Sequence, residues 1–242
     1  MEPGARLLYE GKAKRVYDLG GGEALLEFKD EVTAFDGRMR SRAPGKGIYS
    51  AMLTARLFEV LEDAGIGTHY VCYPGGNSVR VQLHKVLPLE VIVRRYAYGS
   101  MLRRMPLVKK LARLEPPLVE LHYKSDELGD PLLHPLDPVY AGLLEEDELR
   151  ELEDLARRTA RVLAEFWAER GLRLVDLKLE IARSEDGFVI VDEVTGDTMR
   201  LIDKDGRHLD KQVYRDSGSV EALLDAYRLL AEAAGEPGRR CS

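Results

Sequence analysis

The sequence predicts an α+β fold on the strength of strand-like and helix-like stretches that carry different periodicities. Residues 7–29 and 174–193 contain short apolar runs joined by glycine-containing turns, which is typical of antiparallel strands. Residues 48–64 and 145–170 instead place apolar side chains at helical spacing, and a glycine follows each stretch. The 242 residues are enough for one large domain or two smaller ones.

The composition excludes several classes of protein. A formal net charge of −6 argues against a protein that coats nucleic acid, since phosphate-backbone binding needs a basic surface. The sequence has no apolar run long enough to span a membrane and no apolar signal segment near Met1, so we expect a cytoplasmic protein. Cys72 and Cys241 are the only cysteines, and we expect no disulfide framework; the histidines lack zinc-site spacing.

The N-terminal strands enclose a short loop of glycine and lysine. Residues 7–35 read as a small antiparallel meander, with Gly11-Lys12-Ala13-Lys14 between its first two strands. A glycine lets backbone amides approach an anion, and the two lysines supply positive charge. The loop therefore predicts phosphate binding, with an ordinary surface hairpin as the alternative.

The middle of the chain adds a second candidate anion site. A turn carries Asp36, a helix follows over residues 48–64, and residues 69–93 are again strand-like. The last of these strands runs into Arg94, and Ser100 is placed to cap a helix beginning near Met101. Free amides and a guanidinium at this point are suited to a phosphate or carboxylate, and an ordinary helix cap with surface arginines is the alternative.

Residues 113–144 are rich in proline and show little periodicity, so we expect a long irregular loop that covers or binds a ligand. The clearest helix of the chain, residues 145–170, follows it and begins with a run of acids that suits the helix dipole. A final amphipathic helix, capped by Ser219, extends through Ala234.

The stretch 174–193 is expected to be a hairpin with a row of charges on one face. Strict alternation puts Asp176, Lys178 and Glu180 on the face opposite the apolar side chains. A two-residue turn at residues 186–187 would set Glu193 opposite Glu180, whereas a three-residue loop at 185–187 would set Asp192 there. Neighbouring carboxylates need a cation or water between them, which indicates a divalent metal site; a solvated sheet face is the alternative.

Several motifs, taken in order, resemble those of one known family. They are GKAKRVY (11–17), TAFDG (33–37), PGKG (44–47), LPLEVIVRRYAYGS (87–100), KSDELGDP (124–131), LVDLKLE (174–180), VDEVTGDTMR (191–200) and LDKQVYRD (209–216). In this order and spacing they resemble the phosphoribosylaminoimidazole-succinocarboxamide synthases, also called SAICAR synthetases, over nearly the whole chain.

The resemblance implies an ATP-dependent ligase of purine biosynthesis. Such an enzyme joins carboxyaminoimidazole ribonucleotide (CAIR) to L-aspartate, giving SAICAR, ADP and phosphate, by way of an acyl phosphate and with Mg²⁺ on the ATP phosphates. It also implies small-molecule substrates, a homodimer and two lobes with ATP between them. The antiparallel N-terminal lobe would span residues 1–87 and the larger α/β lobe residues 88–242.

The resemblance also implies roles for individual residues. ATP would be bound by Gly11, Lys12, Ala13, Lys14 and Lys124. The nucleotide substrate would be bound by Arg94, Ser100, Asp176, Lys178, Arg200, Lys211 and Arg215. The reaction centre would contain Asp36, Asp197, Lys178 and Arg200. Mg²⁺ would be bound by Glu180 and Asp192, and this choice of Asp192 requires a hairpin turn with an odd number of residues.

Two other functions compete with the ligase. A small-molecule kinase is the nearer rival, because Asp176-Leu177-Lys178 resembles the DxK element of inositol phosphate kinases. A nucleotide-binding regulator without turnover would keep the Gly-Lys loop but would not need paired acids.

Overall fold

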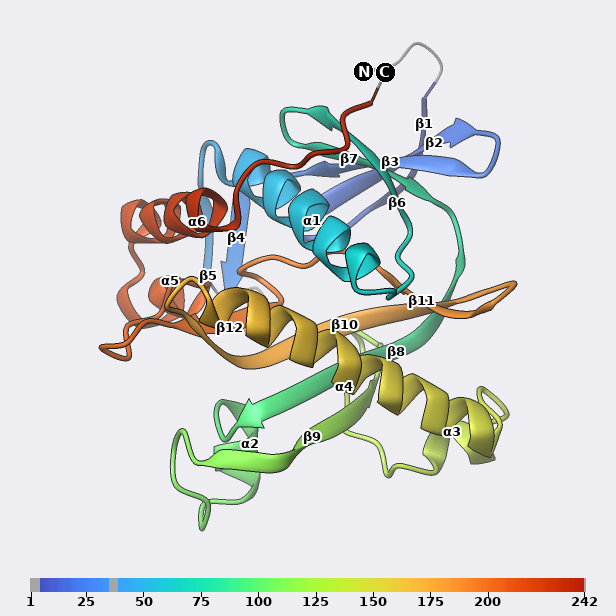
Figure 1. Cartoon of the computed structure of the whole chain (residues 1–242), viewed down its shortest axis with the longest axis vertical. Coiled ribbons are helices and arrows are strands. Elements are labelled where there is room, and N and C mark those ends of the chain that lie inside the picture. Colours follow the sequence, from blue (N-terminus) through green and yellow to red (C-terminus); the bar gives the residue numbers. More distant parts are fainter. Residues whose placement is uncertain (1–4, 35–38, 242) are drawn as a thin grey trace.

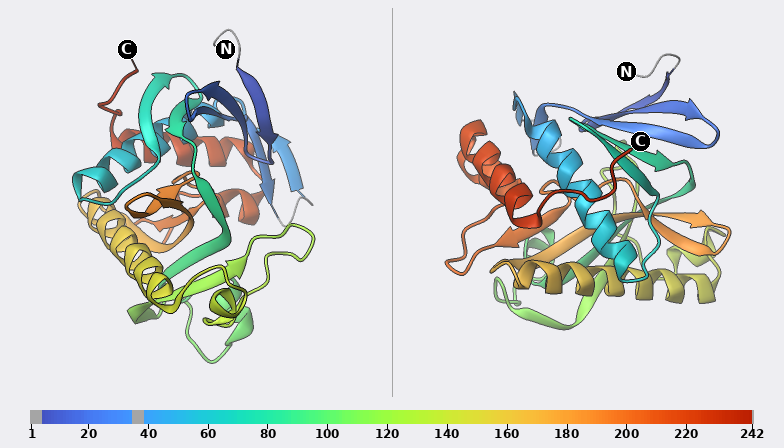
Figure 2. Two further views of the ribbon diagram at one scale, coloured as in Figure 1. Left: turned by 90° about the vertical axis from the view of Figure 1, so that its right-hand side faces the viewer. Right: turned by 45° about the horizontal axis from the view of Figure 1, so that its top comes forward.

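The structure, a computed structural model, describes residues 5–34 and 39–241, and Asp36 lies outside these residues. The described residues form two antiparallel sheets with helices between and beside them, which agrees with the predicted α+β class (Figures 1 and 2). No helix in the described part of the chain is long and apolar enough to cross a membrane.

The first sheet is built mainly from the N-terminal third of the chain. Its strand order is β1-β2-β3-β7-β6, and each neighbouring pair is antiparallel. The bounds are β1 (Arg6–Glu10), β2 (Lys14–Gly20), β3 (Glu23–Phe28), β7 (Ser78–Gln82) and β6 (Tyr70–Gly75). A separate hairpin consists of β4 (Glu31–Ala34) and β5 (Met39–Arg42). Strands β1, β2 and β3 are successive antiparallel neighbours and confirm the predicted meander.

The second sheet positions the charged row. Its order is β11-β10-β8-β9, and β12 pairs with the first half of β10. The bounds are β11 (Gly187–Val191), β10 (Arg173–Ser184), β8 (Lys85–Tyr96), β9 (Arg113–Tyr123) and β12 (Met199–Ile202). Strand β10 lies inside this sheet, and most of its side chains are buried on both faces.

Three long helices and three short ones complete the described fold. The long helices are α1 (Lys46–Asp63), α4 (Glu146–Ala168) and α6 (Val220–Ala234). The short helices are α2 (Ser100–Arg104), α3 (Asp137–Tyr140) and α5 (Gln212–Ser217). The two predicted long helices are confirmed, and Ser219 caps α6 by accepting a hydrogen bond from the Ala222 amide.

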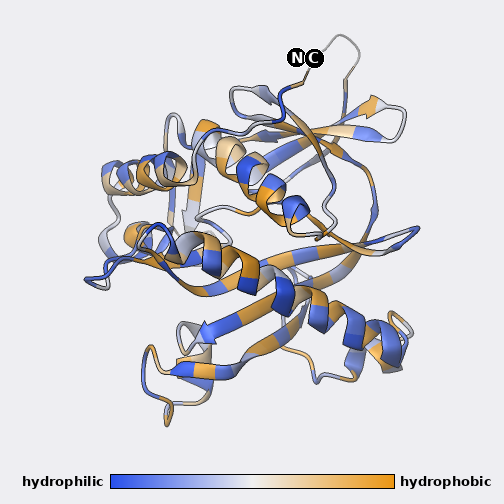
Figure 3. Ribbon diagram, viewed as in Figure 1, coloured by the Kyte–Doolittle hydropathy of each residue, from blue (hydrophilic) through white to orange (hydrophobic). Residues whose placement is uncertain are grey.

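One hydrophobic core joins the two sheets. Helix α1 contacts β3, β6 and β7 of the first sheet as well as α4 and α6, and α4 covers a face of the second sheet (Figure 1). Orange apolar and blue polar residues both appear along α4, as its amphipathic sequence predicts (Figure 3). Trp167 of α4 and Leu177 of β10 are fully buried in this core. The apolar row of β10 therefore faces α4 and the charged row faces away from it.

The prediction of an irregular loop at residues 113–144 is wrong for the first third of that segment. Residues Arg113–Tyr123 form β9, which contains Pro116 and Pro117. Proline cannot donate a ladder hydrogen bond, but β9 is the edge strand of its sheet, where one side needs no partner. The prolines therefore marked an edge strand, and the irregular segment begins after Tyr123.

Neither predicted register of the β10–β11 hairpin is correct. Its two-residue turn is Glu185-Asp186, with Ser184 opposite Gly187, and this register sets Val191 opposite Glu180. The inference that Asp192 requires an odd turn is wrong as well. Asp192 follows the last residue of β11 and has φ of 73°, so the chain leaves the strand there and the alternation of faces ends.

The expectation of no disulfide is also wrong, because Cys72 and Cys241 are bonded. The C-terminal tail runs along β6, where the Tyr73 amide donates to the Arg239 carbonyl and the Cys241 amide donates to the Tyr73 carbonyl. Glu59 of α1 accepts the Gly238 and Arg239 amides at 2.9 and 2.7 Å. The C-terminal tail is therefore fixed to the first sheet, which brings together two cysteines with a sequence separation of 169.

Candidate active site

Two acids and two lysines from four separate segments meet at the end of the charged row of β10. Lys14, at the start of β2, places its Nζ 2.8 Å from Asp192 Oδ1 and 3.3 Å from Glu193 Oε2. Lys124, just after β9, places its Nζ 2.5 Å from Glu180 Oε2. The structure thus brings together four residues that were assigned to ATP and the metal.

The charges in this group influence one another strongly. Burial and the nearby negative charge of Asp192 raise the pKa of Glu180 above its ordinary value. Burial acts in the same direction on Asp192, but the charge of Lys14 outweighs it and the pKa of Asp192 is lowered. Two carboxylates that repel each other and are held by lysines form a site suited to an additional cation.

The remaining ATP candidates lie in the loop before β2. The Gly11 amide donates to the Lys14 carbonyl at 2.9 Å, and the Ala13 carbonyl accepts the Lys29 amide, so the loop is a tight turn. Lys12 extends outward to Asp126 at 2.8 Å, where both side chains are exposed. This ion pair connects the Gly-Lys loop to the segment that carries Lys124.

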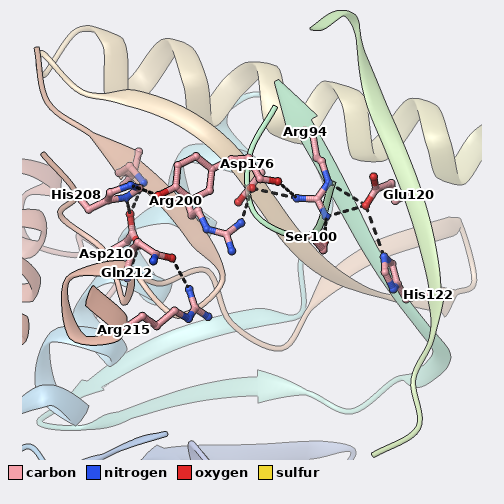
Figure 4. Close-up of polar contacts among 12 residues, drawn as sticks. Arg94, Ser100, Glu120, His122, Asp176, Arg200, His208, Asp210, Gln212 and Arg215 are labelled. Carbon is pink, nitrogen blue, oxygen red and sulfur yellow. Dashed lines mark hydrogen bonds and ion pairs between the residues drawn. The ribbon is translucent and has the colours of Figure 1, made fainter. Parts of the chain in front are cut away.

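The second group is a network of arginines and acids around the ends of β8 and β10. Arg94 is almost fully buried; its Nη2 lies 2.8 Å from Glu120 Oε2, and its Nη1 lies 3.3 Å from Asp176 Oδ2. Arg200 Nη1 donates to the same Asp176 oxygen at 2.5 Å. Burial raises the pKa of Asp176, although Arg200 and Arg94 act in the opposite direction. Figure 4 shows this network extending from Arg200 to Glu120.

Ser100 does not cap α2 as predicted. Gly99 is the N-cap residue of α2, and it supplies no side-chain cap hydrogen bond. The Ser100 hydroxyl instead accepts a hydrogen bond from Arg94 Nη2 at 2.8 Å. Ser100 and Arg94 are thus brought together, but through their side chains and not through a helix terminus.

These side chains surround a small cavity of about 150 Å³. Its lining consists of Ile92, Arg94, Ser100, Asp176, Lys178, Asp197, Thr198, Met199, Arg200 and Arg215. Lys178 Nζ lies 2.7 Å from Glu90 Oε1; burial would lower the pKa of Lys178, but Glu90 outweighs it and the pKa is raised. The cavity is rich in cations and has the polar character of a site for a small anionic ligand.

Asp197 lies between this cavity and the start of α1. Its Oδ2 is 2.5 Å from Lys46 Nζ, and its Oδ1 is 3.4 Å from Lys211 Nζ. Burial would raise the pKa of Asp197, but Lys211 and Lys46 hold it well below its ordinary value. Lys211, assigned to substrate binding, is therefore close to a residue assigned to the reaction centre.

The sequence-based assignment gave no role to Lys46 or Glu120. Lys46 belongs to the PGKG motif, so the motif itself was a signal, but the sequence did not reveal its ion pair with Asp197. Glu120 sits in β9, which was not recognised as a strand, and it pairs with Arg94 and Arg104. Both residues are nearly buried and compensate charges of the site.

Comparison with known proteins agrees with the motifs. The family model described as SAICAR synthetase matches residues 7–228. The phosphoribosylaminoimidazole-succinocarboxamide synthase of Caldivirga maquilingensis is 45% identical over 231 residues, covering 95% of each chain. That of Pyrobaculum aerophilum is 46% identical over 230 residues, covering 95% of this chain and 97% of the relative.

Solved structures give the same result. A SAICAR synthetase in complex with ADP has a TM-score of 0.88 and 38% identity, covering 97% of this chain and 99% of that one. The SAICAR synthetase of Pyrococcus horikoshii has a TM-score of 0.86 and 38% identity, covering 93% and 99%. With its fold, its motifs and its full-length relatives in agreement, this chain belongs to the SAICAR synthetase family.

Proposed function

We propose that this chain is an ATP-dependent ligase that joins CAIR to L-aspartate and forms SAICAR, ADP and phosphate in purine biosynthesis. The observation that carries the proposal is the position of two neighbouring sites on one face of β10. Glu180 lies in the lysine-rich site and Asp176 in the arginine-rich cavity, separated only by Lys178 on the same face. A phosphate-binding site beside a site for an anionic acceptor is what phosphoryl transfer to a carboxylate requires.

ATP would be bound by the Gly11–Lys14 loop and by Lys124. The support is that Lys14 of β2 pairs with Asp192, and Lys124 of the segment after β9 pairs with Glu180. The SAICAR synthetase solved in complex with ADP has this fold over nearly its full length, which supports an adenine nucleotide as a ligand of this chain.

Glu180 and Asp192 would hold Mg²⁺. Their donor set fits the ion, since Mg²⁺ in phosphoryl-transfer sites is commonly bound by one or two carboxylates together with substrate phosphates. When bound, Mg²⁺ would neutralise charge on the ATP phosphates and thereby assist departure of ADP. Lys14 and Lys124 would then be free to contact phosphate oxygens in place of the carboxylates.

The ribonucleotide would occupy the cavity lined by Arg94, Ser100, Lys178, Arg200 and Arg215. A carboxylate oxygen of CAIR would attack the γ-phosphorus, ADP would leave, and an acyl phosphate would result. The amine of L-aspartate would then attack the acyl carbon, and inorganic phosphate would leave with the C–O bond electrons. Asp197, with Asp36 and Lys211, would lie at this second step.

An assay of phosphate release distinguishes the ligase from its rivals. The enzyme is incubated with ATP, Mg²⁺ and CAIR, with and without L-aspartate. Aspartate-dependent formation of phosphate and SAICAR supports the ligase. A stable phosphorylated product formed without aspartate would indicate a kinase, and absence of turnover in both mixtures would refute an enzymatic role.

We further propose a homodimer in the cytoplasm, with lobes 1–87 and 88–242 that enclose ATP. The family resemblance supports the dimer and the location. The lobe division is supported by the sheets, since the first lies within residues 6–82 and the second begins at Lys85. Sedimentation of the purified enzyme tests the dimer.

A further inference from the structure

Three polar side chains form a hydrogen-bonded chain beside the proposed ribonucleotide cavity. His208 Nδ1 lies 2.8 Å from Asp210 Oδ2, and His208 Nε2 lies 3.0 Å from the Tyr98 hydroxyl. Asp210 is fully buried and Tyr98 is nearly so. Figure 4 shows His208 and Asp210 on the side of Arg200 that is opposite Arg94. Among the described residues that line the cavity, none belongs to this chain of three.

The surroundings of Asp210 fix the direction of these bonds. Both carboxylate oxygens accept backbone amides, from Leu201 at 2.9 Å and from Gln212 at 2.7 Å. A carboxylate only accepts, so His208 donates to Asp210 from Nδ1, and in the neutral imidazole Nε2 accepts from the Tyr98 hydroxyl. The Tyr98 ring is therefore held in one orientation by a buried anion two side chains away.

The fixed ring contacts Arg200. The Arg200 guanidinium carbon lies 5.2 Å from the Tyr98 ring centroid, while Nη1 is bound to Asp176. Gly99, next to Tyr98, has φ of 61°, and a Cβ there would lie 3.1 Å from Arg200 Nη2. Arg200 is thus confined by a carboxylate, an aromatic ring and a close backbone.

Asp210 also influences the second arginine. By accepting the Gln212 amide it fixes the start of α5, and Gln212 Oε1 accepts a hydrogen bond from Arg215 Nη1 at 3.4 Å. Arg200 and Arg215 belong to different elements. Both are nevertheless linked through intermediate residues to the buried carboxylate of Asp210. A planar guanidinium binds an anion with two parallel bonds only when its orientation is fixed.

We propose that Tyr98, His208 and Asp210 are positioning residues that orient Arg200 toward an anionic group of the ribonucleotide, and that Asp210 also positions Arg215 through Gln212. The inference rests on the proposed function, because it assumes that the cavity holds this substrate. It predicts that the relay formed by Tyr98, His208 and Asp210 affects binding of the ribonucleotide. Binding of ATP, whose proposed site lies at Lys14 and Lys124, should not change.

The test uses full-length variants in steady-state kinetics with CAIR and ATP varied in turn. Tyr98→Phe keeps the ring and removes the hydroxyl. His208→Leu removes both hydrogen bonds, whereas His208→Gln keeps a donor for Asp210 and an acceptor for Tyr98. Tyr140→Phe is the matched control, because Tyr140 is 80% exposed. Thermal unfolding is measured for every variant.

We expect Tyr98→Phe to raise the KM for CAIR by about threefold to tenfold, the effect of losing one net hydrogen bond, with the KM for ATP unchanged. His208→Leu, which loses two hydrogen bonds, should raise the KM for CAIR by at least as much. His208→Gln should restore much of the affinity, and Tyr140→Phe should match the wild type. Equal KM changes for both substrates, or a His208→Gln enzyme as impaired as His208→Leu, would overturn the relay. If His208→Leu does not fold, Tyr98→Phe decides the question by itself.

Failure of the proposed function has a different signature. A wild-type enzyme without aspartate-dependent phosphate release would refute the ligase whatever the variants do. Calorimetric titration with CAIR then tests the relay alone: weaker binding by Tyr98→Phe than by wild type supports it, and equal binding or none to either protein overturns it.

Discussion

Lys14 Nζ lies 2.8 Å from Asp192 Oδ1, joining the first sheet to the residue that ends the β10–β11 hairpin. This contact closes the proposed ATP site, because the Gly-Lys loop and the acids of the second sheet meet there. Its formation depends on the left-handed backbone of Asp192, which turns the chain out of the strand.

Asp192→Asn should abolish most turnover while leaving the fold intact. The amide keeps the size of the side chain but removes the charge proposed to bind Mg²⁺, and we expect a loss of about 100-fold or more in kcat. The measurement is SAICAR formation at saturating substrates, with thermal unfolding to verify the fold. Asp186→Asn, in the turn of the same hairpin, is the control; near-normal turnover by Asp192→Asn would refute the metal assignment.

Lys46→Met should destabilise the protein. Lys46 is only 2% exposed and compensates the charge of Asp197, so its removal leaves Lys211 as the cation paired with this buried carboxylate. We expect a decrease of about 3–5 kcal/mol in the free energy of unfolding, measured with urea. Lys204→Met, at an exposed lysine, is the control. The double variant with Asp197→Asn should lose less than the sum of the single variants, and strict additivity would contradict the pairing.

The contribution of His122 to stability should depend on pH. Its Nε2 lies 3.6 Å from Glu120 and its Nδ1 lies 2.8 Å from the Asp130 carbonyl, and Glu120 raises the pKa of His122 above 6.5. A raised pKa stabilises the fold fully below the unfolded-state value of about 6.5, and the stabilisation is lost as pH rises through the folded-state value. His122→Gln should therefore reduce the free energy of unfolding more at pH 5.5 than at pH 8.5. The exposed His134→Gln variant serves as the control, and an equal loss at both pH values would disprove the linkage.

Loss of the Cys72–Cys241 disulfide should lower the free energy of unfolding. The bond closes a loop with a sequence separation of 169, so it restricts the unfolded chain strongly. We expect the double Cys72→Ser, Cys241→Ser variant to be less stable by about 2–5 kcal/mol in urea. Reductant should destabilise the wild type and leave the double variant unchanged. If reductant leaves the free energy of unfolding of the wild type unchanged, the disulfide does not stabilise the protein.

The sequence by itself determined the elements whose signals are local. The 3.6-residue period of α4 and the alternation of β10 both reflect which side chains a helix or strand can bury, and both were read correctly. The ordered motifs also singled out Glu180, Asp192, Arg94 and Arg200, and the structure places them in the two groups of charged side chains beside β10. The prolines of β9 favoured a loop when only the sequence was considered. The sheet order is needed to show that β9 is an edge strand, where proline is tolerated.

Only the tertiary structure decided which distant groups meet. The position of Asp192 depends on a single left-handed residue, which no alternation pattern predicts. The pairing of Lys46 with Asp197 depends on how the start of α1 meets the segment between β11 and β12, and the disulfide depends on the path of the tail along β6. The packing of distant segments also covers the charged row of β10. Local sequence fixes which face of a strand is polar, but packing determines whether that face meets water or the cations of other segments.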